Sequence, residues 1–300
     1  MGIRVQRLIA QAGMASRRTA EQWVKAGKVH INGQTAVLGA IVEPGVDTVT
    51  VNHQMVTPAT ARWVLALNKP VGYTTSLRDR HAEHLVSELI PAQYGRLFPV
   101  GRLDRDTSGL LLMTNDGDLA FRLSHPSFAV PKIYEAWVAG IPKAGHLQRL
   151  ERGIMLDGGR ARAHEVRVVE RVNGNSRVRL TLTEGKKREV RRIFAAVGHP
   201  VLSLQRVAFA GILLEDLAEG ACRPLTHREL KSLAQRVNPP SKKTSQPVRD
   251  PRGKGEDRKH GESQTPGRGG IQHAGRAPLS SGGPRDPLGH ARGNPQRPHG

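Results

Sequence analysis

Two acidic residues stand in a short charged loop that leads directly into an apolar strand. The segment Gly101–Gly117, GRLDRDTSGLLLMTNDG, carries Asp104 and Asp106 ahead of the apolar run Leu110–Met113. Such a loop is typical of a scaffold that holds a reactive side chain at the edge of a rigid sheet. The two carboxylates would point in opposite directions along an extended chain, so they are poorly placed as a glycosidase-like acid pair. We interpret Asp106 as a cap or turn residue, and the same structural role is the alternative for Asp104.

A second group of charges lies at the start of a predicted helix, in the segment Glu184–Arg192, EGKKREVRR. The helix has an apolar stripe, formed by Val190, Ile193, Phe194 and Val197. On a helical wheel Lys187 and Arg191 flank that stripe, which lets Arg191 turn toward the interior. Arg188 and Arg192 point away from it, so we expect them to face solvent or nucleic-acid phosphates.

The amino-acid composition indicates which part of the chain is folded and can position these residues. The chain has 300 residues, a net charge of +20 and a single cysteine, Cys222. The segment 239–300 has 12 Gly, 10 Pro and no aromatic residue, so we expect it to be a disordered basic tail. An excess of positive charge in body and tail favours a polyanionic partner, for which nucleic acid is the usual case.

Other classes of protein and site are disfavoured by the sequence. The chain has no apolar run of the length that spans a membrane and no signal peptide, so we expect a cytoplasmic protein that binds no membrane. One cysteine excludes an intrachain disulfide and a Cys-rich metal site. His81, His84 and Glu88 could share a helix face within 78–91, but no convincing fourth ligand accompanies them, and we predict a polar helix without a metal.

The N-terminal region is expected to form two short helices and a small sheet. Val5, Leu8, Ile9 and Ala12 have helical spacing, and Ser16 can cap a second helix. Strands are predicted at 29–31 and 49–51, with a tight turn at Asn32-Gly33. Four basic residues lie near the helix junction: Arg17, Arg18, Lys25 and Lys28. Without further information, an ordinary helical hairpin with solvated charges would explain them equally well.

Two of these segments carry resemblances to known families. Gly101–Gly117 resembles the pattern G-R-L-D-x-x-T-S-G-L-L-L-x-T-N-D-G around the catalytic aspartate of the pseudouridine synthases, in the form of the RsuA/RluB branch, and every fixed position is matched. Arg7–Gly33 resembles the pattern of the S4 RNA-binding domain. Together the two resemblances cover about residues 1–235, with the S4 domain first and the catalytic domain after it, and a match this long is specific.

The resemblance implies roles for individual residues. Asp104 occupies the position of the catalytic aspartate, and Arg191 that of its basic partner, which would keep the carboxylate ionised and oriented. Tyr134 matches the tyrosine that packs against the target base, although a buried core tyrosine is the alternative. The residues expected to contact RNA are Arg17, Arg18, Lys25, Lys28, Arg102, Lys132, Lys187, Arg188 and Arg192. No cofactor and no metal is implied.

The expected architecture is α+β, with a mixed, mainly antiparallel sheet flanked by helices in the larger domain. We predict an S4 domain over residues 1–52, a linker over 53–61, a catalytic domain over 62–237 and a tail over 238–300. The implied activity is isomerisation of a uridine in ribosomal RNA, with ribosomal RNA or an assembly particle as partner of a monomer. The basic tail favours the RluB type, which modifies 23S rRNA, over the RsuA type, which modifies 16S rRNA. A non-catalytic rRNA-binding assembly factor and a general basic nucleic-acid binder are the alternatives.

Overall fold

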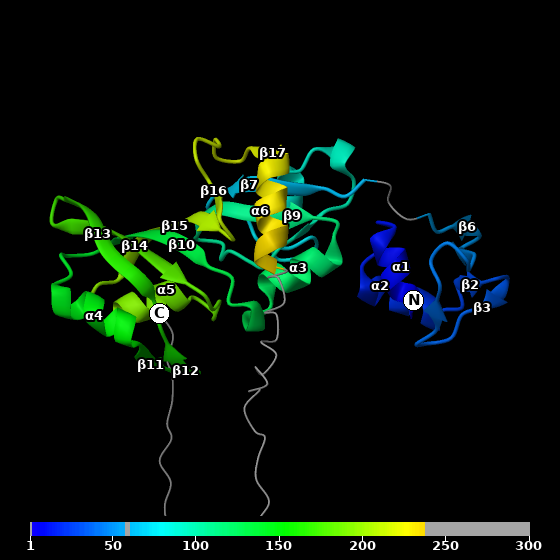
Figure 1. Ribbon diagram of the computed structural model, residues 1–300, viewed down its shortest axis with the longest axis horizontal. Coiled ribbons are helices and arrows are strands. Elements are labelled where there is room, and N and C mark those ends of the chain that lie inside the picture. Colours follow the sequence, from blue (N-terminus) through cyan, green and yellow to red (C-terminus); the bar gives the residue numbers. More distant parts are fainter. Residues whose placement is uncertain (1, 58–60, 238–300) are drawn as a thin grey trace, which may run out of the picture. The chain divides into compact units, whose positions relative to one another are not determined.

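The structure, a computed structural model, describes residues 2–57 and 61–237, and the predicted tail lies outside them (Figure 1). The small N-terminal domain comprises β1 (Ile3–Arg4), α1 (Val5–Gln11), α2 (Arg17–Lys25), β2 (Val29–Ile31), β3 (Gln34–Thr35), β4 (Ile41–Val42), β5 (Val49–Val51) and β6 (Gln54–Met55). As predicted, Ser16 caps α2, and its Oγ accepts a hydrogen bond of 3.0 Å from the amide of Thr19. Both helices pack on the sheet through one apolar core that includes Val5, Ile9 and Val29.

The small sheet extends further along the chain than the sequence indicated. Strand order is β3-β2-β5-β6, with antiparallel neighbours. Asn32 and Gly33 form the predicted turn, both at positive φ. Asn52 and His53 adopt the same kind of turn at φ 48° and 67°, although neither is glycine, and they bring β6 back beside β5. The N-terminal part of the predicted linker 53–61 therefore belongs to the sheet, and Val56 is buried in this core.

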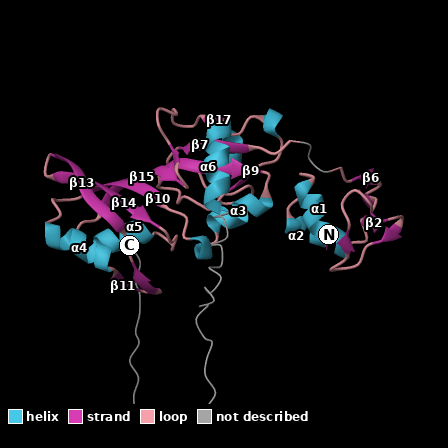
Figure 2. Cartoon of the chain, viewed as in Figure 1, coloured by secondary structure: helices cyan, strands magenta, loops and turns pink. Residues whose placement is uncertain are grey.

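The second domain is built on one nine-stranded sheet (Figure 2). Its strands are β7 (Val64–Lys69), β8 (Phe98–Pro99), β9 (Ser108–Thr114), β10 (Lys132–Val138), β13 (His164–Val172), β14 (Asn175–Leu182), β15 (Val201–Phe209), β16 (Ile212–Leu213) and β17 (Cys222–Pro224). The main order is β13-β14-β10-β15-β9-β7-β17, and the pairs are antiparallel except β15–β9. The α+β architecture with a mainly antiparallel sheet is thus confirmed.

Helices cover both faces of this sheet. They are η1 (Val86–Leu89), η2 (Ala92–Tyr94), α3 (Gly117–Ser124), η3 (Pro126–Phe128), α4 (Ala144–Arg152), α5 (Glu189–Ala195) and α6 (His227–Val237), with the hairpin β11 (Ile154–Leu156) and β12 (Gly159–Ala161). Leu110 packs in the core with α3 and α6, and its neighbour Leu111 packs in the opposite core with α4 and α5. The centre of β9, residues 110–113, is entirely apolar because both faces of the strand are buried there.

The parallel pairing of β9 with β15 requires a glycine. Strands β9 and β15 pair only at Ser108 with Gln205 and at Gly109 with Arg206. A Cβ on Gly109 would lie 2.4 Å from the carbonyl oxygen of Arg206, and the residue has φ 102°. Only glycine fits such a close approach at this φ. Gly109 therefore permits the pairing that connects the strands β13-β14-β10-β15 with the strands β9-β7-β17.

The segment 78–91 departs from its prediction. Its regular structure is limited to the short 3-10 helix η1, and His81 and His84 lie in an exposed loop ahead of it. Helical spacing of polar residues did not produce a long helix because few apolar side chains were available to anchor one. In the described parts of the chain, no helix is both long and apolar enough to cross a membrane.

Candidate active site

Hydrogen bonds to its backbone hold the loop that precedes β9. The Thr75 hydroxyl donates to the carbonyl of Leu103 at 2.7 Å and accepts from its amide at 3.3 Å. The amide of Gly72 donates to the carbonyl of Arg105 at 2.8 Å. The turn closes on itself through the amide of Thr107, which donates to the carbonyl of Asp104 at 3.1 Å. Asp104 therefore lies on a turn whose backbone is fixed by hydrogen bonds.

A buried lysine is hydrogen-bonded to the same turn. Lys69, at the end of β7, has no exposed surface, and its Nζ donates to the carbonyl of Thr107 at 2.8 Å and to that of Pro70 at 2.7 Å. Burial lowers the pKa of Lys69 to about 8, while the charges of Asp106 and Asp104 oppose that shift. Both aspartates therefore lie within electrostatic range of this ammonium group.

The two arginines at the start of α5 bind Asp106. Arg188 donates from Nη1 and Nη2 to the two carboxylate oxygens of Asp106, both at 2.9 Å. Arg191 places Nε 3.1 Å from Oδ2 of the same residue and donates from Nη2 to its carbonyl at 2.7 Å. Burial alone would raise the pKa of Asp106, but the hydrogen bonds from Arg188 and the charge of Arg191 outweigh it and hold that pKa below its usual range.

This pairing differs from one expectation and adds to another. Arg191 turns inward as predicted, but among the described residues its ionic partner is Asp106, and no ion pair joins it to Asp104. Arg188 is exposed, as expected for a side chain that faces solvent, but its guanidinium also binds Asp106. It precedes the first turn of α5 at φ 51°. Asp106 is thus more than a turn residue, because it ties α5 to the loop of Asp104.

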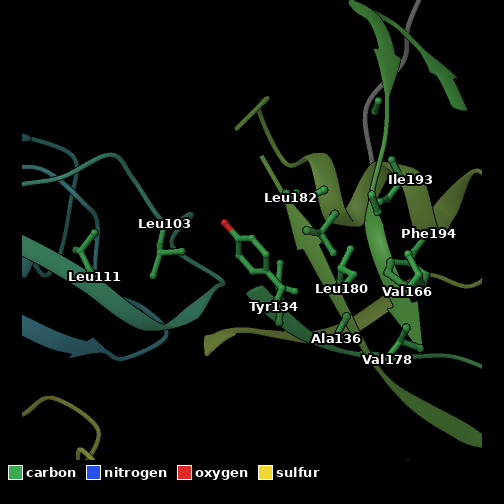
Figure 3. Packing of buried hydrophobic residues seen from close by; sticks show 14 of the residues in the cluster. Leu103, Leu111, Tyr134, Ala136, Val166, Val178, Leu180, Leu182, Ile193 and Phe194 are labelled. Carbon is green, nitrogen blue, oxygen red and sulfur yellow. The ribbon is translucent and has the colours of Figure 1, made fainter. Parts of the chain in front are cut away.

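Asp104 and Tyr134 line one cavity of about 400 Å³. Further lining comes from the loop at 102–107, from β14 and β15, and from the segment 185–190. Tyr134 is 9% exposed and belongs to the core on the face of α4 and α5. Figure 3 shows its ring between Leu103 and Leu182, with the hydroxyl directed toward the side of Leu103. Tyr134 is therefore a core residue that also lines the cavity.

The predicted RNA contacts fall into distinct environments. Arg102, Lys187 and Arg188 are exposed and line the cavity. Arg192 is half-buried and donates to the carbonyl of Asp157. Lys132 is also half-buried, and its Nζ donates to the carbonyl of Val130 at 2.7 Å and lies 5.7 Å from the centre of the Phe209 ring. Burial lowers the pKa of Lys132 to about 8. Arg192 and Lys132 thus have structural partners of their own.

The basic residues of the small domain are accessible. Arg17, Arg18, Lys25 and Lys28 are all exposed. Lys25 pairs with Glu21 at 3.6 Å, one helical turn away. An exposed ion pair of this kind contributes little to stability, so the charge stays available to a polyanion.

Sequence reasoning missed five buried polar side chains around this site: Lys69, Thr75, Thr107, Glu189 and Arg206. Arg206 is 2% exposed, donates from Nε to the carbonyl of Leu110 at 2.7 Å, and lies over the Phe209 ring. A signal was available for Lys69, since it ends the short, mainly apolar strand β7. The signal for Arg206 was weaker, because buried and partly exposed positions alternate along β15. Glu189 and Thr107 gave none, because a helix start and a turn are ordinary places for them.

The described parts of the chain contain no cluster of side chains that could bind a metal ion. No group of three or more His, Cys, Asp or Glu side chains there is arranged to hold a metal ion. His84 instead stacks on Tyr73, with ring centres 5.1 Å apart, and pairs with Glu88 at 3.6 Å.

Known proteins resemble this chain over both domains. The model of the RNA pseudouridylate synthase family matches residues 63–196, and that of the S4 domain matches residues 3–47. Ribosomal large subunit pseudouridine synthase B of Bacillus subtilis is 40% identical over 232 residues, which cover 77% of this chain and 95% of that protein. An RNA pseudouridine synthase of Aquifex aeolicus, named as uncharacterized, is 40% identical over 239 residues, covering 79% and 96%.

A solved structure agrees with these relatives. The crystal structure of a pseudouridylate synthase matches with a TM-score of 0.54 at 28% identity, and it covers 77% of this chain and 99% of its own. Identity of 40% along nearly the full length of two relatives, in the order S4 domain and then synthase domain, leaves one conclusion. The chain belongs to the RNA pseudouridine synthase family of isomerases, with an N-terminal S4 domain.

Proposed function

We propose that the chain converts one uridine of 23S ribosomal RNA to pseudouridine, with the carboxylate of Asp104 as the reacting group. The observation that carries this proposal is the position of Asp104 and the lack of an ionic partner for its carboxylate among the described residues. Its backbone is fixed by the turn contacts, and it lines a cavity together with an aromatic ring. Among the described residues, the ionic contacts of the two arginines go to Asp106 and leave the carboxylate of Asp104 unpaired.

The chemistry needs a carboxylate placed in this way. In the reaction the N1–C1′ bond of uridine breaks and a C5–C1′ bond forms, while C5 gives up a proton and N1 gains one. Neither an oxidant nor a reductant is required. A carboxylate held beside ribose and base in a pocket that excludes bulk water is suited to this exchange.

The remaining side chains have supporting roles in the proposal. The target base must leave its stack, and the Tyr134 ring offers an aromatic surface in place of the lost neighbours. Arg191 and Arg188 act through Asp106, since they fix the turn from which Asp104 projects and add positive potential beside it. Arg102 and Lys187, with the exposed cations of the small domain, would bind phosphates.

The partner and location follow from the same proposal. Two relatives, from Bacillus subtilis and Pseudomonas aeruginosa, are named as large-subunit pseudouridine synthases, which supports 23S rRNA as substrate. We propose that the protein acts as a monomer in the cytoplasm, on ribosomal RNA or a particle that contains it.

The experiment is a pseudouridine map of ribosomal RNA from cells that lack this chain, with and without the wild-type gene restored. The proposal expects one site in 23S rRNA to lose its modification and to regain it on complementation. Loss of a site in 16S rRNA would move the substrate to the small subunit. An unchanged map would overturn the proposal and favour a non-catalytic rRNA-binding factor.

A further inference from the structure

Two buried polar atoms belong to side chains that line the cavity of Asp104 and have no partner among the described residues. They are Oε1 of Glu189 and Oγ1 of Thr107. Glu189 is 4% exposed and Thr107 is 2% exposed. A buried acceptor or donor left without a partner is destabilising, so such atoms are rare unless something else supplies the missing bond.

The other oxygen of Glu189 is already engaged. Its Oε2 accepts a hydrogen bond of 3.0 Å from the amide of Lys186, and its own amide donates to the carbonyl of Lys186 at 3.2 Å. These bonds close the turn that begins α5 and fix the orientation of the carboxylate. Oε1 is therefore an oriented acceptor rather than a mobile one.

The direction of the pKa shift of Glu189 is consistent with a missing donor. Burial raises the pKa of Glu189, the amide of Lys186 and the nearby charge of Lys132 lower it, and the net direction is upward. A donor that met Oε1 would stabilise the ionised carboxylate further.

We propose that Glu189 binds the N3–H group of the target uracil through Oε1 and thereby selects uridine against cytidine. This inference rests on the proposed function. Uracil presents an acceptor, a donor and an acceptor along the edge O2, N3–H and O4, so a carboxylate oxygen opposite N3 gains a bond. Cytosine has a lone pair at N3, and it would face the same oxygen without a hydrogen between them.

The geometry of the reaction gives this bond a second role. To exchange N1 for C5 at the ribose, the free uracil must make a half-turn about the axis through N3 and C6. That rotation interchanges O2 with O4 and leaves N3–H pointing in the same direction. An acceptor at N3 can stay bonded throughout, and the hydroxyl of Thr107 can donate to whichever carbonyl oxygen lies beside it. Glu189 would thus select uridine and also hold the base while it rotates.

The test measures binding without turnover, with the Asp104→Asn protein and a fragment of ribosomal RNA around the mapped uridine. The fragment carries uridine, cytidine or 3-methyluridine at that position. We expect the uridine fragment to bind about 10-fold to 100-fold more tightly than either of the others, because a well-placed base contact gives discrimination of this size. Adding Glu189→Ala should bring the three affinities within about threefold of one another.

Glu189→Gln makes a sharper variant. The amide oxygen must stay with the Lys186 amide, so the amide nitrogen takes the place of Oε1 and presents a donor. The cytidine fragment should then bind at least as tightly as the uridine fragment. Lys187→Ala is the matched control, because an exposed cation at the cavity should weaken all three fragments equally.

The results separate the two proposals. Equal binding of uridine and 3-methyluridine by the Asp104→Asn protein overturns the role of Glu189, and this measurement needs no substitution at Glu189. If both Glu189 variants still prefer the uridine fragment to the same extent, the role of Glu189 is overturned as well. If Glu189 had a purely structural role, its variants would lower the three affinities in parallel. If the wild-type protein modifies no uridine at all, the proposed function itself has failed and this inference fails with it.

Discussion

Asp106 and Arg188, 82 residues apart in the chain, are joined by two hydrogen bonds of 2.9 Å that run from separate guanidinium nitrogens to separate carboxylate oxygens. This two-point contact is the geometry in which arginine binds carboxylates most specifically. It ties the start of α5 to the turn that carries Asp104. The position of the proposed catalytic residue therefore depends on a neighbour two residues away.

Replacing Asp106 by asparagine should lower the rate more than the stability. The asparagine side chain cannot hold both Arg188 and Arg191, so we expect the single-turnover rate to fall about 10-fold to 100-fold, as for other small misplacements of a reactive group. The pair is partly exposed, so the free energy of unfolding should fall by no more than about 1 kcal/mol. Rapid-quench kinetics and chemical denaturation measure the two effects.

A matched control lies on the same turn. Arg105 pairs with Glu83 at 3.1 Å, and both side chains are exposed. Glu83→Gln should leave rate and stability unchanged within error. A rate for Asp106→Asn equal to that of Glu83→Gln would show that Asp106 does not position the site.

Tyr134 should tolerate loss of its hydroxyl and not loss of its ring. Among the described residues the hydroxyl has no hydrogen-bond partner, so Tyr134→Phe should keep the rate within about threefold. Tyr134→Ala removes the surface on which the base packs, and the rate should fall about 10-fold to 100-fold, since stacking on an aromatic ring contributes about 1–3 kcal/mol per base.

The alanine variant should also lose about 3–5 kcal/mol of stability, because Tyr134 is part of the core. Rates are therefore compared at a temperature where circular dichroism shows every variant folded. A Tyr134→Phe rate as low as that of Tyr134→Ala would mean that the hydroxyl, rather than the ring, takes part in the reaction.

The extent to which sequence determined this structure differs between helix α5 and the turn of Asp104. The apolar stripe of Val190, Ile193 and Phe194 was predictable, since helical periodicity reports burial directly. The partner of Arg191 was not, because a wheel gives the direction of a side chain and not the residue it meets. Arg188 is exposed as expected, but its contact with Asp106 could not be read from the wheel either, because Arg188 lies before the first turn of α5.

The buried cations show a second limit. Lys69 and Arg206 are almost fully buried, and each is stabilised by carbonyl oxygens from distant parts of the chain. Whether a charge in an apolar strand is buried depends on such tertiary partners, which no local pattern contains. By contrast, the turn at Asn32-Gly33 was predictable from its residue types, whereas the similar turn at Asn52-His53 was not.

Gly109→Ala should disrupt the sheet. A Cβ there would lie 2.4 Å from the carbonyl oxygen of Arg206, and the backbone has φ 102°, so strain and a steric clash act together. We expect a loss of more than about 3 kcal/mol in the free energy of unfolding, or no folded protein. Gly145→Ala is the control, because a Cβ in α4 meets nothing within 4 Å, and it should be neutral or slightly stabilising. Equal melting temperatures for the two variants would contradict the close approach of β9 and β15.

The pH dependence of stability should reveal the buried lysine. Burial lowers the pKa of Lys69 to about 8 in the folded state, against 10.5 in the unfolded chain. Between these values the unfolded chain binds more protons, so the free energy of unfolding should rise with pH, by about 3 kcal/mol in total from this residue. Lys69→Met should lack this rise, and the difference between wild type and variant across pH 8 to 10.5 measures it.

Lys143→Met serves as the comparison for that measurement, because Lys143 is exposed at the start of α4. Its stability profile should run parallel to that of the wild type. Parallel profiles for Lys69→Met and the wild type would instead mean that burial does not lower the pKa of Lys69.

The most direct measurement compares Asp104→Asn with the wild type on an RNA fragment that contains the mapped uridine, by single-turnover formation of pseudouridine and by RNA affinity. We expect the rate to fall about 1000-fold or more, as for the loss of an essential reacting group, with affinity unchanged within about twofold. Asp216→Asn, at an exposed position in the same domain, should match the wild type in both. If Asp104→Asn forms pseudouridine at the wild-type rate, Asp104 is not the reacting group.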